Sequence, residues 1–172
     1  MTMKIRKYTA LVLLGLLGLA GLRADPWDVA KVGDRPFPVS GTAIDGRSVS
    51  LDQFKGKVVL VYLFSTQPGA GMTELMLLER DMWPRYKSAG LQIIGVARDT
   101  DARKLAEAVR AMHIEFPLIP DPKKDIFLHY ASRGHPRAYL VGKDGTIRLS
   151  SLGYSDDELD RISAVVDREL KR

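Results

Sequence analysis

The segment YLFSTQPGAGMTEL, residues 62–75, is the part of this sequence in which chemistry is best sought. It leaves a strand-like apolar run, passes through the letters PGAG and enters a helix-like stretch. Glycines at a helix start expose backbone N–H groups that can hold an anion or a peptide carbonyl oxygen. Loops that bind phosphate also carry a lysine here, whereas Gly71 is followed by Met72 and Thr73. We therefore interpret PGAG first as a turn, with ligand binding as the alternative.

The chain has no cysteine and three histidines. Reduction of a disulfide or of a peroxide needs a thiolate nucleophile, which no serine or threonine replaces. Thiol-dependent catalysis is therefore excluded, and the folded domain must be stable without disulfide bonds. His113 and His129 fall on separate elements and show no spacing typical of metal ligands. We expect no cofactor.

The first 24 residues have the pattern of a signal peptide. Lys4, Arg6 and Lys7 form a basic start, and residues 9–22 form an apolar run. That run is about 14 residues long, which is shorter than the roughly 20 residues of a membrane-spanning helix. We predict removal after Ala20 or Ala24 and a periplasmic or secreted protein. Only an uncleaved signal segment would attach it to a membrane.

Removal of this segment also changes the charge of the protein. The whole chain carries a net charge of +5, from 26 basic and 21 acidic side chains. Four of the basic residues and none of the acidic ones lie in residues 1–24. The predicted domain, residues 25–172, is therefore almost neutral, and its composition gives no support to binding of nucleic acid.

Hydrophobic patterning predicts a single α/β domain. The helices and strands that it predicts alternate along the chain, with buried β-branched and aromatic runs as strands and apolar stripes as helices. We expect a hairpin at 41–51, strands at 57–65 and 91–97, a helix at 71–88 kinked by Pro84, a helix at 100–114, a strand at 116–121, a short helix at 123–131, a hairpin at 137–151 and a helix at 155–170. This order predicts a mixed central sheet flanked by helices.

Four side chains on the first of these helices have two interpretations. Met72 and Met76 are one turn apart and are interpreted as core packing, with an adaptable contact surface as the alternative. Trp83 is interpreted as packing at the kink in preference to contacting a partner. Glu74 is interpreted as an acid favoured by the N-terminal end of the helix dipole.

The order and spacing of four stretches resemble a known family. They are VGDRPFPVSGTAIDGRSVSLDQFKGKVVLVYLFS, SAGLQIIGVARDT, FPLIPDPKKDIFLHYA and GHPRAYLVGKDGTIR. Together they resemble the thioredoxin-like superfamily in its redoxin branch, which includes the AhpC/TSA peroxiredoxins and the TlpA-like exported thiol oxidoreductases. The resemblance covers roughly Val32–Gly153. It implies a thioredoxin-like fold with an N-terminal β-hairpin extension.

The resemblance also locates the positions where the catalytic cysteines are missing. Aligned without a gap on Glu74, the two cysteine positions of the TlpA-like pattern are Pro68 and Gly71. The peroxiredoxin pattern places its residues at Phe64, Pro68 and Gly71, and none of the three matches. Pro136 resembles the proline that is typically cis and faces the dithiol. The implied binding residues are Pro68, Gly69, Ala70, Gly71, Met72, His135, Pro136 and Arg137.

Three functions remain open at this point. The first is an accessory or binding module that uses the degenerate active-site groove to hold an exported protein or peptide. The second is the oxidoreductase or peroxidase that family membership suggests, which the lack of cysteine opposes. The third is a copper(I) site at Met72 and His135, by analogy with copper-handling relatives of the same fold. We interpret these two residues instead as a core methionine and a surface histidine.

Overall fold

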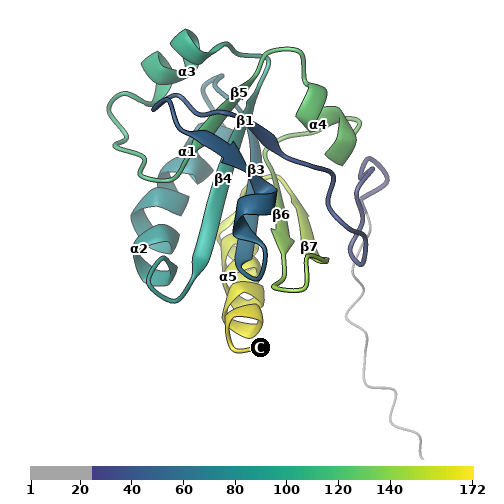
Figure 1. Cartoon of the computed structure of the whole chain (residues 1–172). Helices are drawn as coiled ribbons and strands as arrows, with labels where there is room; N and C mark the ends of the chain where they lie inside the picture. The colour runs from purple at the N-terminus through teal and green to yellow at the C-terminus, as the bar shows by residue number, and fades with distance from the viewer. Residues whose placement is uncertain (1–24) are drawn as a thin grey trace, which may run out of the picture.

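A mixed sheet of five strands forms the centre of the domain. The computed structural model describes residues 25–172, so the predicted signal peptide lies outside the described residues. The strands are β3 (Val58–Ser65), β4 (Leu91–Arg98), β5 (Leu118–Asp121), β6 (Arg137–Val141) and β7 (Ile147–Leu152), in the spatial order β5-β4-β3-β6-β7. Strands β3, β4 and β5 are parallel, whereas β6 and β7 pair antiparallel (Figure 1). The predicted α/β class and mixed sheet are confirmed.

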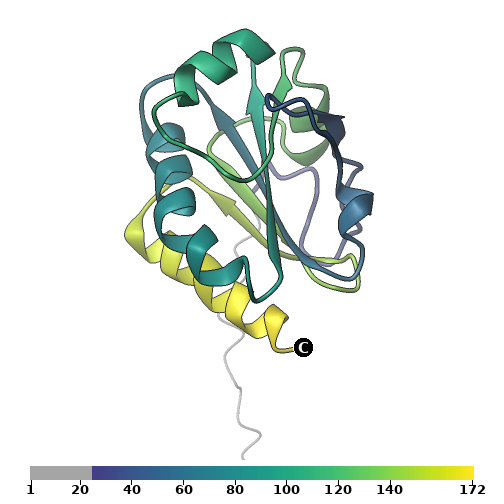
Figure 2. The ribbon, with the colours of Figure 1, turned by 60° about the vertical axis from the view of Figure 1, so that its left-hand side comes forward.

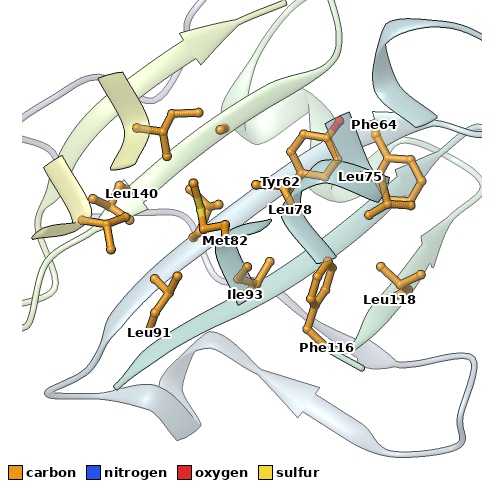
Figure 3. Close-up of a cluster of buried hydrophobic side chains, with 14 of the residues drawn as sticks. Tyr62, Phe64, Leu75, Leu78, Met82, Leu91, Ile93, Phe116, Leu118 and Leu140 are labelled. Atoms are coloured by element: carbon orange, nitrogen blue, oxygen red, sulfur yellow. The ribbon is translucent and has the colours of Figure 1, made fainter. Parts of the chain in front are cut away.

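Strand β3 is buried along its whole length because both faces of the sheet are covered. Its residues alternate between two clusters of apolar side chains. Tyr62 and Phe64 point into the larger cluster, where they meet Leu75, Leu78 and Met82 (Figure 3). Val59, Val61 and Leu63 point into the smaller cluster on the other face. The unbroken apolar run in the sequence is thus explained by burial on two sides.

The helix predicted at residues 71–88 is one rod with three parts. It consists of α1 (Ala70–Leu77), a π-helical turn η2 (Leu78–Met82) and α2 (Trp83–Tyr86). Pro84 has no N–H to donate, and the N–H of Trp83 bonds to Leu78 O, five residues back. The predicted irregularity at Pro84 is therefore a π turn, and the apolar stripe stays buried across it.

Three further helices complete the two outer layers. They are α3 (Ala102–Val109), α4 (Asp125–Tyr130) and α5 (Asp156–Leu170). Side chains of α1, α2, α3 and α5 pack on the larger cluster, and those of α4 pack on the smaller one. Figure 2 shows α1, α2 and α5 together on one side of the sheet. Ser155 caps α5 by accepting the N–H of Glu158 at 3.1 Å. The prediction of α3 to residue 114 was wrong because the chain turns after Val109 and His113 has a positive φ of 51°.

The predicted N-terminal hairpin is present and lies outside the central sheet. It pairs β1 (Ser40–Thr42) with β2 (Ser48–Ser50), and a 3₁₀ helix, η1 (Leu51–Phe54), follows. The hairpin packs beside β5, since Ile44 N donates to Leu118 O at 3.0 Å. A methyl group added at Gly41 would come within 2.6 Å of the Ile119 side chain, so this contact is close.

The residues before the hairpin, 25–39, form a segment of turns and irregular backbone that we call the strap. Val29 N donates to Tyr130 O, while Gly33 N and Asp34 O bond to the backbone of Ile147. The strap therefore ties α4 to the start of β7. Within residues 25–172, no helix is long and apolar enough to cross a membrane.

Candidate functional site

The carboxyl end of β3 and the start of α1 form the first half of the candidate site. Gly69 is the N-cap of α1 and has φ 141°, a conformation that only glycine adopts readily. Because glycine has no side chain, no side-chain cap satisfies the first N–H groups of the helix. Pro68, Gly69 and Ala70 are exposed, Gly71 is buried and Met72 is partly buried. The first three residues are thus accessible to a ligand.

The loop before β6 forms the second half. The antiparallel register pairs Leu63 with Arg137, which places Pro136 beside the end of β3. The His135–Pro136 peptide bond is cis, as the resemblance implied. Pro136 is buried and His135 is exposed. The fold therefore brings the two predicted segments to the same end of the sheet.

Arg137 does not line this surface, although it was included in the predicted groove. Only 1% of the residue is exposed. Its guanidinium forms ion pairs with Asp28 and, at 3.2 Å, with Asp25. It also donates to the carbonyl oxygens of Arg133 and Gly134, at 2.8 and 3.1 Å. Arg137 thus holds the loop before Pro136 in place from inside the protein, and its side chain is unavailable to a ligand.

Asp28 is the centre of this buried network and was not identified from the sequence. Besides Arg137, it accepts the hydroxyls of Tyr139 and Ser150, each at 2.7 Å. The network joins the strap to both β6 and β7 and to the loop that carries His135. The sequence indicates only that Arg137, at the start of an otherwise apolar strand, needs an acidic partner if it is buried. The residues near Arg137 in the sequence do not identify Asp28 as that partner.

Glu74 lies on the buried face of α1, in its second turn. It is 1% exposed, and its Oε1 atom has no hydrogen-bond partner among the described residues. Glu74 is beyond the first turn of α1, so its interpretation as an acid at the helix N-terminus was wrong. Burial raises the pKa of the Glu74 carboxyl to about 7, opposed by the Tyr62 hydroxyl and assisted by the negative charge of Glu158.

The Tyr62 hydroxyl links this carboxyl to the helix start. It donates to Gly71 O at 2.7 Å. Burial, followed by the charge of Glu74, raises the pKa of Tyr62 well above its usual value, so the hydroxyl stays protonated. The site can thus hold a proton close to Gly71 at neutral pH. The chain has no thiol, however, whose proton this carboxyl group could accept.

The other residues considered in the sequence differ in how deeply they are buried and in what they contact. Met72 packs against the core, but Met76 is 44% exposed, so the core interpretation of Met76 was wrong. Trp83 packs edge-on against Phe116 and donates to Glu115 at 2.8 Å, which supports its interpretation as packing at the kink. His129 stacks on Phe37.

No three His, Asp or Glu side chains in residues 25–172 are placed to share a metal ion. That result does not bear on a methionine–histidine pair. The copper(I) alternative at Met72 and His135 is therefore untested, and the preferred interpretation agrees with the packing of Met72 on the core and the exposure of His135.

Comparison with known proteins identifies what this arrangement is similar to. The model of the AhpC/TSA family matches residues 32–150. A provisionally named peroxiredoxin of Mycobacterium tuberculosis is 31% identical over 127 residues, covering 74% of this chain and 80% of the relative. The chloroplastic peroxiredoxin Q of Sedum lineare is 30% identical over 132 residues, or 70% and 69% of the two chains.

The solved structures show the same fold. A protein from Bacteroides thetaiotaomicron, provisionally described as a protein disulfide isomerase, superposes with a TM-score of 0.79 at 27% identity. The superposition covers 85% of this chain and 94% of that one. The predicted thioredoxin-like fold is therefore confirmed.

Proposed function

The chain belongs to the AhpC/TSA family, and from this premise we propose that it is an exported redoxin-fold protein that has lost thiol catalysis and acts as a binding or accessory module. One observation carries the proposal: the chain has no cysteine at all. The attack on a disulfide or a peroxide oxygen starts from a thiolate, and the hydroxyl groups of serine and threonine do not replace it. A family scaffold without this group retains only its ability to bind.

The proposed binding surface is the groove formed by Pro68–Met72 and the His135–Pro136 loop. Two features support it. Pro68, Gly69 and Ala70 are exposed at a helix start without a side-chain cap, so backbone N–H groups are free to bond a carbonyl oxygen. The exposed His135 adds a donor and an acceptor at the same end of the sheet. These groups suit an extended segment of an exported protein or peptide.

Site-specific photo-crosslinking in the native host tests the binding role. Benzoylphenylalanine is placed at Ala70, which is exposed in the groove, and in a control variant at Ala164, which is exposed on α5. We expect a discrete adduct from Ala70 that is absent from Ala164. A folded Ala70 variant that yields no adduct, or the same adduct from both positions, would contradict a recognition role for this groove.

The loss of catalysis is tested separately with the purified protein. Peroxide consumption and insulin reduction are measured with a thiol reductant, against a blank without protein. We expect no turnover above the blank. Reproducible turnover would overturn the first proposal and restore the alternative, an oxidoreductase of the AhpC/TSA family.

The proposed export rests on the N-terminal sequence and needs its own measurement. The protein is expressed in its host, the cell envelope and culture medium are separated from the cytosol, and the mature N-terminus is determined by mass spectrometry. We expect a chain that begins after Ala20 or Ala24. A full-length chain found in the cytosol would contradict export.

A further inference from the structure

A concave site lies at the opposite end of the sheet from the proposed binding surface. This basal cavity, as we call it, has a volume of about 350 Å³ and is enclosed by three segments. These are residues 35–38 of the strap, residues 50–57 around η1, and the β6–β7 turn at residues 141–145. Val59 lines it near the start of β3, whereas the groove follows Ser65 at the end, so the two sites are roughly 20 Å apart.

The floor of the basal cavity is apolar. Val59 and Val141 line it with exposures of 1% and 4%, and the partly buried Leu51 and Phe54 line its side. All four belong to or pack against the smaller core cluster. The cavity is thus continuous with packed core, and its volume lies within the range of small-molecule sites.

The rim of the basal cavity is cationic. Four basic residues line it, and the two acidic residues that also line it have other partners: Asp52 pairs with Lys55, and Asp144 pairs with Arg148. Arg35, Lys57 and Lys143 form no ion pair within residues 25–172. Arg35 and Lys143 bond only to the carbonyl oxygens of Asp144 and Leu170, at 3.1 and 2.9 Å. Because the Lys143 ammonium is held at the end of α5, which packs on the other face of the sheet, Arg35 and Lys57 are the positive charges left at the cavity without an ion-pair partner within residues 25–172.

The position of Arg35 is built into the fold. Its strap neighbours are fixed to β7 by two backbone bonds to Ile147, each 2.9 Å long. Gly145 has φ 77°, and a Cβ atom at that position would lie 2.9 Å from the Arg35 guanidinium. The glycine thus leaves room for the guanidinium over the turn. The site exists before any ligand arrives, which lowers the cost of binding.

We propose that the basal cavity binds an amphipathic monocarboxylate. The apolar body of the ligand lies on Val59, Val141 and Phe54, and its carboxylate is held by the cationic rim. A purely polar anion would gain nothing from the apolar lining, and an uncharged apolar ligand would leave Arg35 and Lys57 without a counter-charge. The proposal is independent of the groove and of its proposed partner.

Titration of the ¹⁵N-labelled domain with decanoate, followed by NMR, tests this inference. Decanol is the matched probe that lacks the charge. We expect amide shift changes concentrated in residues 51–57 and 141–145, and binding of decanol about tenfold weaker than that of decanoate. Shift changes centred elsewhere, or equal affinities for the two probes, would overturn the proposal.

Charge reversal on the rim provides the second arm of the test. Lys57 is exposed and unpaired among the described residues, so Lys57→Glu should leave the fold intact and weaken decanoate binding about five- to tenfold. Lys123→Glu makes the same change at an exposed lysine outside the cavity and should alter the affinity less than twofold. If both variants lost the same affinity for decanoate, the cause would be the net charge of the protein, and the proposed site would be refuted.

Discussion

The carboxyl group of Glu74 is enclosed in the larger core cluster with one oxygen atom unpartnered. Removing a carboxylate from water disfavours its charged form, and the negative charge of Glu158 adds to this effect. The folded protein therefore binds a proton at Glu74 more tightly than the unfolded chain does. This difference couples the stability of the domain to pH.

Replacing Glu74 by glutamine should remove that coupling. The pKa of Glu74 rises from 4.5 to about 7 on folding, so between these values the folded state holds more protons than the unfolded state. The free energy of unfolding is therefore expected to fall as the pH rises through this window, by up to about 3 kcal/mol. In Glu74→Gln this decline should be absent. Urea unfolding at pH 5, 6, 7 and 8 measures it.

The exposed Glu107 on α3 is the matched control, because Glu107→Gln makes the same chemical change at a solvated site. It should keep the pH dependence of the wild type. If the wild-type stability were flat across the window, or if both variants behaved alike, Glu74 would not be the titrating group.

The environments of single residues were the hardest to predict from the sequence. The burial of a helical side chain depends on which elements cover its side of the helix, and the spacing of apolar residues does not show this directly. Glu74 was assigned to the first turn because the helix start was placed at Gly71, and it lies beyond that turn. Met76 was assigned to the core from its spacing to Met72, yet the stripe that packs runs through Leu75 and Leu78.

At the scale of elements, the junction of β3 and α1 has room for side chains at the two positions where the resemblance places cysteines. Gly71 has an ordinary backbone conformation, and a Cβ atom added there would be 3.4 Å from Ser65 O and 3.5 Å from the Phe64 side chain, which are normal contacts. Pro68 is exposed. Neither position therefore opposes a cysteine sterically.

The variant Pro68→Cys/Gly71→Cys should form an intramolecular disulfide under oxidising conditions. Pro68 precedes the N-cap Gly69 and Gly71 lies in the first turn of α1, so the turn at Gly69 must bring the two Cβ atoms to the spacing of about 3.5–4.5 Å that this bond requires. Thiol counting and intact mass before and after reduction measure it, and each single-cysteine variant serves as a control that can only dimerise. Persistent free thiols in the oxidised monomer would show that the alignment of the two cysteine positions is wrong.

Helices and strands in which apolar residues recur at a regular spacing were predictable from the sequence. Features that depend on tertiary contacts were not. The apolar run of β3 and the stripe of α5 are visible in the sequence because burial repeats along them. The π turn was anticipated only as a kink at Pro84, since the sequence does not say how a helix absorbs a missing N–H. The end of α3 depended on the turn at His113, which no spacing reveals.

At the scale of the whole molecule, the strap closes the domain. The ion pair of Arg137 with Asp28 joins residues 109 apart in the chain, and Tyr139 and Ser150 converge on the same carboxylate. Sequence patterns describe neighbours along the chain, so they gave no indication of what the Pro-rich strap packs against. The same closure positions the loop of the groove and one wall of the basal cavity.

Loss of Asp28 should therefore destabilise the whole domain. In Asp28→Ala the guanidinium of Arg137 stays buried without its main counter-charge, and breaking such a pair costs roughly 3–5 kcal/mol. Asp25→Ala removes the longer and more exposed of the two ion pairs and should cost about 1 kcal/mol or less. Chemical unfolding followed by circular dichroism at neutral pH measures both.

A second substitution separates the unpaired charge from the lost hydrogen bonds. If the buried charge is the main cost, Asp28→Ala/Arg137→Met should be more stable than Asp28→Ala alone, because the apolar side chain needs no counter-charge. The double variant should also unfold in a single transition, since the strap keeps its backbone bonds to Tyr130 and Ile147. Equal stability of Asp28→Ala and Asp25→Ala would contradict this view and would mean that the strap is held by its backbone bonds alone.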